Sequence, residues 1–438
     1  MFEFIKYIQP TNYYRLVSSM PQSILLDTIS NNELLLHYKD ADSSVIDRLY
    51  YLLQSGEIPV ASQSRNALQD KTIYNTHDNY VFIRRYFSLS QLIYVFFLRL
   101  MCLKNPVLEF WCFFYSMLRV KRVKLVRKAC ADWNSFQSQL LQQNPFVSVI
   151  IPTLNRYTYL KDVLSDLENQ NFKNFEVIIV DQSEPVDFDF YNNWNLNIRL
   201  VQQQEKALWL ARNSAIEISC GEYILLFDDD SRVEKDWISN HLKCLDFFRC
   251  QISAGTTQTI VGGGLGSKDK YFHLSDVFDT GNALVHKSVF TNVGLFDRQF
   301  EKERMGDAEF GLRALLGGCS IIANPYSNRI HLKVETGGLR QMGSWDALRP
   351  KSLFSPRPIP SVLYLIRKYF GNKEAVFYLL KNIPQSYMPY KFKKNKYMRL
   401  TYLLIFPLFI PIAIIAVWKS WRSASQKLHV GSLISKLN

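Results

Sequence analysis

The middle of the chain alternates short apolar runs with stretches of helical periodicity. The runs at 146–154 (FVSVIIPTL) and 175–180 (FEVIIV) are rich in β-branched residues, which predicts strands buried on both faces. Between them, apolar side chains recur at helical spacing: Tyr157, Leu160, Val163, Leu164 and Leu167. The pattern predicts further strands at 198–201 and 222–227 and a helix over 207–218. This order of elements predicts an α/β domain with a mostly parallel sheet.

Two other apolar segments lie outside this zone. Residues 92–118 are strongly apolar and aromatic but are interrupted by two basic residues and a proline. We expect helices that lie in a membrane interface or, alternatively, an ordinary buried helical hairpin. Residues 400–418 carry no charge and are about long enough to cross a bilayer, although two prolines lie within them. A spanning helix and a re-entrant or in-plane segment both fit this second pattern.

The charge balance points to an anionic partner. The chain has 52 Lys and Arg against 39 Asp and Glu, a formal net charge of +13. Basic residues cluster beside the two apolar segments, at 119–128 and 391–399, and do not interleave with aromatic residues in a nucleic-acid-binding motif. We therefore expect an anionic membrane, and no nucleic acid, as the partner. Seven cysteines without a C-x-x-C pair, and an N-terminus without a signal-peptide pattern, favour the cytosolic side.

Polar residues follow three of the predicted strands at their ends. Residues 152–156 (PTLNR) follow the first strand, Asp181 ends the second, and Asp228, Asp229 and Asp230 follow the fourth. Ligands bind outside the carboxyl ends of parallel strands, so we expect one acidic crevice there. Adjacent carboxylates repel each other unless a cation offsets them, and hard oxygen ligands suit Mg²⁺ or Mn²⁺. A turn or a helix cap is the alternative interpretation of these acidic residues.

Four ordered segments resemble a known family: VSVIIPTLNR (147–156), FEVIIVDQS (175–183), LARNSAIEISCGEYILLFDDD (210–230) and GNALVHKSVFTNVGLFD (281–297). Together they resemble the family 2 inverting glycosyltransferases of the bacterial polysaccharide-assembly type, over about residues 145–335. The resemblance implies the GT-A (Rossmann-like) fold of a nucleotide-diphospho-sugar transferase. It also implies a nucleotide-sugar donor, with UDP-sugars favoured, and Mn²⁺ or Mg²⁺ as cofactor.

The resemblance implies roles for single residues. Those that would bind the nucleotide-sugar are Pro152, Thr153, Arg156, Asp181, Arg212, Asp228 and Asp229. Asp181 would accept a hydrogen bond from the base, and Arg212 would contact a phosphate or the ribose. In the family's D-x-D motif the last carboxylate binds the metal ion, which assigns that role to Asp230. His331 matches in position a histidine that supplies a further metal ligand in many relatives.

The stretch RMGDAEFGLRA (304–314) resembles the family's acidic motif, whose Asp is the general base. Asp307 is therefore the predicted catalytic residue, and a simple helix-capping role is the alternative. Gly306 stands where the family usually has Glu, and Glu309 is the nearest substitute for the base. This departure also leaves open a catalytically inactive membrane scaffold of the same fold.

Two further segments resemble known functional motifs, but we do not expect either to have the function of the motif it resembles. The segment VGGGLG (261–266) lacks a flanking strand and helix, so we expect a substrate-side loop and not a dinucleotide fingerprint. The segment QMGSW (341–345) resembles the QxxRW motif of processive polysaccharide synthases, but Ser344 replaces the arginine. That departure argues against a processive synthase.

The sequence predicts five parts. Residues 1–143 form a helical N-terminal region of unknown function that is partly membrane-associated, and 144–345 form the GT-A domain. Residues 346–399 form a basic linker or helical region, 400–418 a transmembrane or re-entrant helix, and 419–438 a short basic tail. We expect an enzyme that moves one sugar onto a membrane-associated acceptor, such as a lipid-linked glycan, in cell-surface polysaccharide biosynthesis. It would lie at the cytoplasmic face of the cell membrane.

Overall fold

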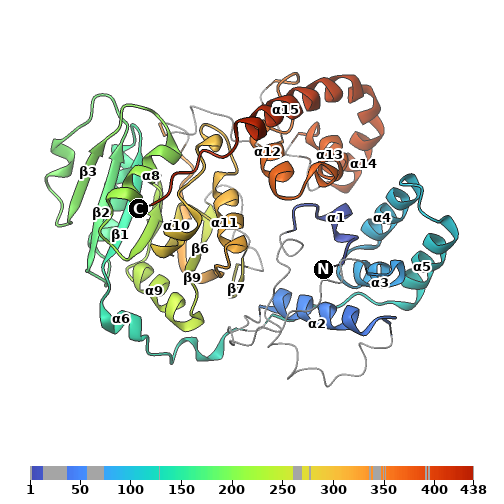
Figure 1. Cartoon of the computed structure of the whole chain (residues 1–438). Coiled ribbons are helices and arrows are strands. Elements are labelled where there is room, and N and C mark those ends of the chain that lie inside the picture. The colour runs from blue at the N-terminus through green and yellow to red at the C-terminus, as the bar shows by residue number, and fades with distance from the viewer. Residues whose placement is uncertain are drawn as a thin grey trace. The chain divides into compact units, whose positions relative to one another are not determined.

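The computed structural model describes residues 2–12, 37–56, 74–127, 129–259, 269–275, 278–334, 337–338, 347–348, 350, 352–389, 392 and 395–437. The chain forms two compact units, which we describe separately (Figure 1). The sheet unit comprises Lys128–Pro350, Ile359–Val362 and Ser420–Asn438. The helical unit comprises Met1–Arg127, Lys351–Pro358 and Leu363–Lys419.

Nine strands within the described residues form one sheet in the sheet unit. They are β1 (Val147–Thr153), β2 (Phe175–Asp181), β3 (Ile198–Gln202), β4 (Tyr223–Phe227), β5 (Ser231–Val233), β6 (Ile252–Thr259), β7 (His273–Leu274), β8 (Asn282–His286) and β9 (Ile321–His331). Their order is β3-β2-β1-β4-β8-β6-β9-β5, with β7 paired to β9. Strands β1, β2 and β4 are buried along their whole length, as the continuous apolar runs predict.

The sheet is mixed, which corrects the expectation of a mostly parallel one. Strands β1 to β4 pair in parallel, and β6 also runs parallel to β9. In contrast, β8 is antiparallel to both β4 and β6, and β5 and β7 are antiparallel to β9. Hydrophobic periodicity identifies a buried strand but carries no information on its direction, so the later strands could not be oriented from the sequence.

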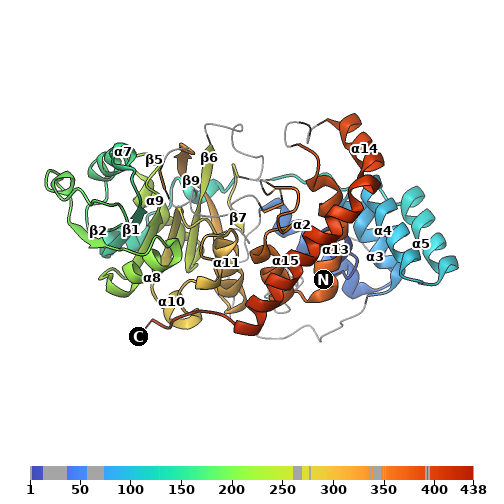
Figure 2. The same ribbon diagram turned by 90° about the horizontal axis from the view of Figure 1, so that it is seen from above.

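Helices cover both faces of this sheet. Figure 2 shows α7 and α9 on one face and α8, α10 and α11 on the other. The bounds of the helices in this unit are η3 (Ala131–Trp133), α6 (Gln139–Gln143), α7 (Tyr157–Glu168), η4 (Asp189–Tyr191), α8 (Leu208–Ile218), α9 (Trp237–Phe248), α10 (Ser288–Val293), η5 (Arg298–Phe300) and α11 (Gly306–Leu316). The predicted helices at 157–167 and 207–218 are thus confirmed as α7 and α8. Helices on both faces leave the strand ends as the free edge at which a ligand can reach the sheet.

The helical unit contains α1 (Ile5–Ile8), α2 (Ala41–Ser55), α3 (Thr76–Tyr86), α4 (Leu89–Met101), α5 (Pro106–Arg119), α13 (Asn372–Ser386), α14 (Lys396–Ile405) and η8 (Phe406–Phe409). Two more helices, α12 (Pro360–Tyr369) and α15 (Ile410–Val430), carry residues of both units. Helices α4 and α5 form a hairpin in which Phe96 and Phe113 stack at 4.6 Å between ring centroids. The apolar run at 92–118 therefore folds as two helices.

The apolar segment at 400–418 is divided among three elements. It begins in α14, passes through η8 at Pro407 and continues into α15. Among the residues with a described position, no helix combines the length and the apolar character that crossing a bilayer requires. Its membrane association stays a prediction.

The segment after α15 packs on the sheet unit as an extended tail (Figures 1 and 2). The backbone carbonyls of Leu433 and Ser435 accept hydrogen bonds from the N–H groups of Arg298 and Leu295, at 3.1 and 2.9 Å. The N–H of Leu433 donates in turn to the buried carboxylate of Asp297 at 2.9 Å. The tail thus lies against the segment that leads into α11.

Candidate active site

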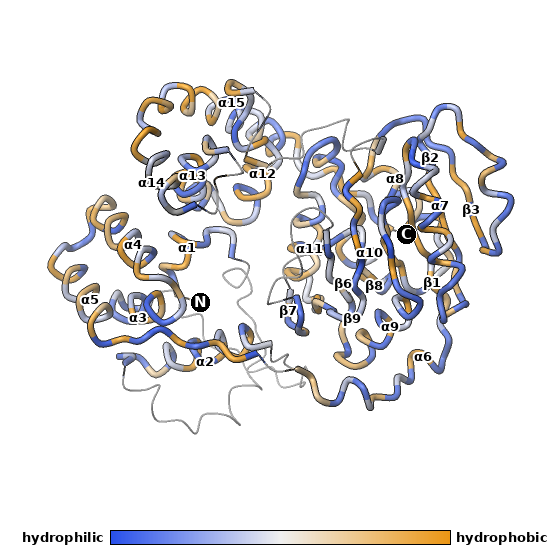
Figure 3. The backbone as a smooth tube through the Cα atoms, turned by 180° about the vertical axis from the view of Figure 1, so that it is seen from behind, coloured by the Kyte–Doolittle hydropathy of each residue, from blue (hydrophilic) through white to orange (hydrophobic). Residues whose placement is uncertain are grey.

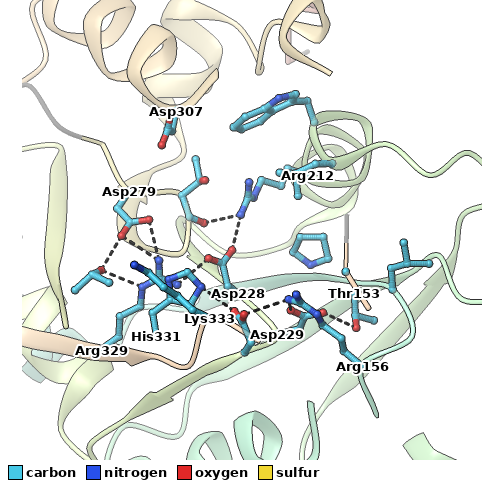
Figure 4. A pocket seen from close by; sticks show the side chains of 18 of the residues that line it. Thr153, Arg156, Arg212, Asp228, Asp229, Asp279, Asp307, Arg329, His331 and Lys333 are labelled. Carbon is cyan, nitrogen blue, oxygen red and sulfur yellow. Dashed lines mark hydrogen bonds and ion pairs between the residues drawn. The ribbon is translucent and has the colours of Figure 1, made fainter. Parts of the chain in front are cut away.

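A cavity of about 620 Å³ lies at the strand ends of the sheet unit (Figure 4). Residues from β1, β6 and β9 line it, together with the three aspartates that follow β4, residues of α8 and the beginning of α11 with the turn before it. Strands β1 and β4 run in parallel, so the polar residues that follow them reach the same edge. The cavity is therefore where the predicted crevice was expected.

Asp228, the first of the three aspartates, is held between two arginines. Its Oδ1 accepts a hydrogen bond from Arg212 Nη2 and its Oδ2 accepts one from Arg329 Nη1, both at 2.8 Å. Burial alone would raise the pKa of this carboxyl, but Arg329 and Arg212 outweigh it and hold the pKa far below its usual range. Asp228 is therefore a fixed carboxylate at any pH near neutrality.

Arg329 organises one wall of the cavity, and the sequence analysis missed it. Its Nη1 also donates to Ser231 at 2.9 Å, and its Nε donates to Thr257 at 3.0 Å. Its Nη2 donates to both oxygens of Asp279, at 3.1 and 3.0 Å. All five N–H donors of this buried guanidinium are used, so Arg329 fixes the positions of Asp228 and Asp279 together.

Asp229 faces β1 and positions two predicted nucleotide-binding residues. Its oxygens accept hydrogen bonds from Thr153 Oγ1 and from Arg156 Nη1, both at 2.9 Å. Burial raises the pKa of Asp229 to about 6, more than the neighbouring Arg156 lowers it. The carboxylate of Asp229 is thus occupied by protein partners, and its contribution is to hold Thr153 and Arg156 at the cavity wall.

Asp228, Asp230 and His331 form a candidate metal centre. Each offers one ligand atom, and these atoms all lie within 4.8 Å of one another. The Nε2 of His331 is buried 3.2 Å from Asp230 Oδ1, yet it makes no hydrogen bond within the described part of the chain. Burial raises the pKa of Asp230, but the adjacent imidazole outweighs it and lowers the pKa below its ordinary value. Two carboxylates and a buried imidazole nitrogen that makes no hydrogen bond in the described part of the chain fit a divalent ion such as Mn²⁺ or Mg²⁺.

Asp307 lies across the cavity from Asp228 (Figure 4). It is the second residue of α11, which follows Met305 in a left-handed backbone conformation (φ 88°). One carboxylate oxygen accepts a hydrogen bond from the N–H of Ala308 at 2.8 Å. Burial raises the pKa of Asp307, which makes it a stronger base than an exposed aspartate. The residue at the N-cap position is Met305, so Asp307 is not the cap of this helix.

The structure gives a physical reason for Gly306, the position where the family usually has Glu. A Cβ atom at this position would lie 2.3 Å from Cζ2 of Trp209. The indole of Trp209 is buried and donates a hydrogen bond from Nε1 to the carbonyl of Phe300 at 3.0 Å. Trp209 therefore fills the space that a larger side chain would need, and the glycine is an adaptation to it.

Two residues singled out by sequence lie outside the cavity lining. Asp181 Oδ2 accepts hydrogen bonds from the hydroxyls of Tyr157 and Tyr191, at 2.6 and 2.8 Å. Glu309, the proposed substitute base, is fully buried and pairs with Arg313 at 3.0 Å. It follows Asp307 by two residues, which turns it to a different face of the helix. Pro152 and Arg212 do line the cavity.

The crevice is not acidic overall, which corrects a further expectation. Its lining contains Asp228, Asp229, Asp230, Asp279 and Asp307, and also Arg156, Arg212, Arg304, Arg329 and Lys333. The lining thus contains as many formally positive as formally negative side chains among its Asp, Arg and Lys residues. The sequence signal was misleading because three of the aspartates are adjacent in the chain, whereas the cations come from four separate segments.

The segments at 261–266 and 341–345 lie outside the described residues, so their interpretation stays as the sequence analysis left it.

Part of this chain is similar to proteins that are already known. Residues 148–302 match the family model described as glycosyl transferase family 2. EpsH of Bacillus subtilis (strain 168), a protein described as a glycosyltransferase, is 26% identical over 214 residues, covering 43% of this chain and 62% of EpsH. TuaG of the same organism, described as a teichuronic acid biosynthesis glycosyltransferase, is 25% identical over 170 residues, covering 38% of this chain and 66% of TuaG. Neither relative is matched over two thirds of its length.

Among solved structures, the chain is similar to S. aureus TarS 1–349 crystallised with UDP-GlcNAc. The two share 16% sequence identity with a TM-score of 0.45, over 65% of this chain and 92% of that one.

Proposed function

Because the chain contains a family 2 glycosyltransferase domain, we propose that it transfers a single sugar from a nucleotide-sugar donor to an acceptor hydroxyl, with inversion at the anomeric carbon. The observation that carries this proposal is the arrangement of the cavity. Asp228, Asp230 and His331 converge on one side of it, and Asp307, a partly buried base, faces them from the other. A donor placed between them would have its diphosphate beside Asp228, Asp230 and His331 and its anomeric carbon toward Asp307.

Asp228, Asp230 and His331 would hold a divalent ion, Mn²⁺ or Mg²⁺. Such an ion supplies Lewis-acid stabilisation of the charge that grows on the departing diphosphate. The geometry that supports the site is the convergence of three ligand atoms within 4.8 Å, from the buried imidazole of His331 and from two carboxylates whose pKa values lie below the ordinary range.

Arg212 would bind the donor phosphates. Its Nη2 is used by Asp228 and by the carbonyl of Thr280, whereas its Nε and Nη1 are buried without a hydrogen-bond partner in the described structure. Unpaired donors on a buried guanidinium are costly, and a phosphate oxygen would satisfy them. UDP-sugars remain the favoured donors on the resemblance of the sequence motifs.

Asp307 would act as the general base. Its carboxylate takes the proton of the acceptor hydroxyl as the oxygen forms a bond to the anomeric carbon. The bond from that carbon to the diphosphate oxygen breaks on the opposite face, and a nucleoside diphosphate leaves. An inactive scaffold loses its support here, because Trp209 accounts for Gly306 without any loss of the base.

We further propose a lipid-linked or other membrane-associated glycan as acceptor, in cell-surface polysaccharide biosynthesis at the cytoplasmic face of the cell membrane. The description of TuaG as a teichuronic acid biosynthesis enzyme supports a polysaccharide product. The apolar and basic segments beside the catalytic domain support an acceptor held at a lipid surface.

The experiment incubates the purified protein with a panel of sugar nucleotides, acceptor-bearing membranes and Mn²⁺ or Mg²⁺, and measures released nucleotide with and without a chelator. We expect release from one donor, its loss with chelator, and a fall of about 10²–10⁴-fold in Asp307→Asn while nucleotide binding persists. Glu309→Gln is unsuitable as a control because Glu309 is fully buried beside Arg313, so Glu205→Gln serves instead, since the pair of Glu205 with Arg298 lies at the surface. Absence of release from every donor, or full activity of Asp307→Asn, would overturn the proposal.

A further inference from the structure

The α4–α5 hairpin of the helical unit has an outer surface that is almost entirely apolar. Large side chains on α4, on the turn and on α5 are exposed; they include Phe97, Met101, Leu103, Val107, Trp111 and Leu118. Leu103 at the turn is 93% exposed and Trp111 is 68% exposed. Figure 3 shows the hydrophobic character running along both helices. Soluble proteins rarely leave a continuous apolar surface of this kind without a partner.

Two charged residues within the hairpin, Arg99 and Glu109, are turned inward. Residues 89–118 contain three charged side chains, Arg99, Lys104 and Glu109. Arg99 Nε donates to Glu109 at 3.0 Å, and Tyr80 donates its hydroxyl proton to the same carboxylate at 2.7 Å. Arg99 also lies over the ring of Phe4 at 4.3 Å. Only Lys104 remains exposed among these three, so both charges that could have made the outer surface polar are satisfied inside the unit.

A basic strip follows the hairpin directly. Arg119, Lys121, Arg122 and Lys124 are all exposed, whereas Val120 between them is buried. The strip is tied to the helical unit by a hydrogen bond from Val123 N–H to the carbonyl of Arg85 at 2.8 Å. An apolar surface bordered by cations matches a bilayer that carries anionic headgroups, because its acyl region takes the apolar side chains and its headgroups pair with the strip.

The helices are too short to cross the bilayer. α4 has 13 residues and α5 has 14, about 20 Å each, against a hydrocarbon core of about 30 Å. The hairpin therefore suits shallow insertion, in which Trp111 lies at the headgroup level and Lys104 extends its charge toward water.

We propose that residues 89–124 form a monotopic docking surface that inserts the outer side of the α4–α5 hairpin into an anionic lipid bilayer. This inference rests on the proposed function, because that function includes a membrane-bound acceptor. Vesicle binding and nucleotide release are measured separately, so the two can fail independently.

The test uses the full chain in vesicle flotation, with vesicles of phosphatidylcholine alone or mixed with phosphatidylglycerol. We expect binding to the mixed vesicles, and a loss of at least about tenfold in Leu103→Glu/Trp111→Glu. Phe188→Glu, an exposed aromatic outside the hairpin, is the matched control and should bind normally. Neutralising the strip with Arg119→Gln, Lys121→Gln and Arg122→Gln should weaken binding to anionic vesicles and reduce its dependence on salt.

Nucleotide release from a soluble donor, measured in the same variants, separates this inference from the proposed function. Loss of vesicle binding with retained release in Leu103→Glu/Trp111→Glu supports the docking surface. Equal flotation of the wild type and this variant would overturn it, and so would equal binding to neutral and anionic vesicles. A concentration-dependent oligomer that the same variant abolishes, without vesicle binding by the wild type, would assign the surface to self-association and overturn it as well.

Discussion

The pairing of Gly306 with Trp209 yields a quantitative prediction. In Gly306→Ala the added Cβ would meet Cζ2 and Cε2 of Trp209 at 2.3 and 2.4 Å, whereas ordinary contacts begin near 3.4 Å. Trp209 or the start of α11 must therefore move by roughly 1 Å, in a region where Trp209 is also fixed by its hydrogen bond to Phe300. Overpacking of this kind costs about 1–3 kcal/mol.

A second effect has the opposite sign. Alanine is a better helix former than glycine by up to about 1 kcal/mol, but Gly306 is the first residue of α11, where this preference is weak. We expect the steric effect to win and the free energy of unfolding to fall by about 1–2 kcal/mol. For a unit of this size, the melting temperature should drop by about 2–8 °C.

A double-mutant cycle measured by thermal unfolding tests the assignment. In a Trp209→Leu background the obstructing ring atoms are gone, so Gly306→Ala should cost little or nothing there. Nucleotide release should fall in the single variant, because Asp307 is the next residue along α11. A Gly306→Ala protein as stable as the wild type, or equal costs in the two backgrounds, would refute the steric explanation.

Four further predictions concern the site. Transfer should decline as the pH falls through the raised pKa of Asp307, and therefore at higher pH than for an ordinary aspartate; a rate profile that is flat into the acidic range contradicts this. The same raised pKa means that the charged form of Asp307 weighs against the folded state at neutral pH, so Asp307→Asn should not lower the melting temperature. Arg329→Gln should destabilise the sheet unit by roughly 3 kcal/mol in chemical denaturation, since it leaves Asp279 without its cation and Asp228 with Arg212 alone, and an unchanged midpoint would contradict its role. His331→Ala should weaken Mn²⁺ binding by at least about tenfold in calorimetry, and His286→Ala, at a partly exposed histidine outside the cavity lining, should not; equal affinities would exclude His331 as a ligand.

Local signals in the sequence were sufficient for the first half of the sheet and for part of the site. Continuous apolar runs located β1, β2 and β4, and the polar residues after them located the edge where Thr153, Asp228 and Asp230 meet. These inferences worked because strand burial and strand ends are recorded in consecutive residues.

The remaining site residues depend on contacts between distant segments. Asp279 precedes a strand that no pattern oriented, and its partner Arg329 comes 50 residues later. One signal was available for Arg329, because it lies two residues before His331 in β9 and side chains two apart share a face of a strand. For Asp181 the sequence predicted the position, at the end of β2, but not the contacts. Its carboxylate accepts hydrogen bonds from Tyr157 and Tyr191, and no local pattern in the sequence indicates these partners.

The tail after α15 determines when, during synthesis, the segment before the catalytic base Asp307 gains its hydrogen-bond partners. The segment at 294–299 lies directly before the turn that carries Asp307, and it is hydrogen-bonded by residues more than 130 positions later in the chain. Contacts of such long sequence separation form late, after the local strands and helices have paired. The sheet can therefore be assembled on the ribosome while the turn before Asp307 still lacks its partners. A chain ended at Val430 should fold its sheet yet show faster amide exchange at 295–298, so assembly of the fold and completion of the catalytic side are separate events in time.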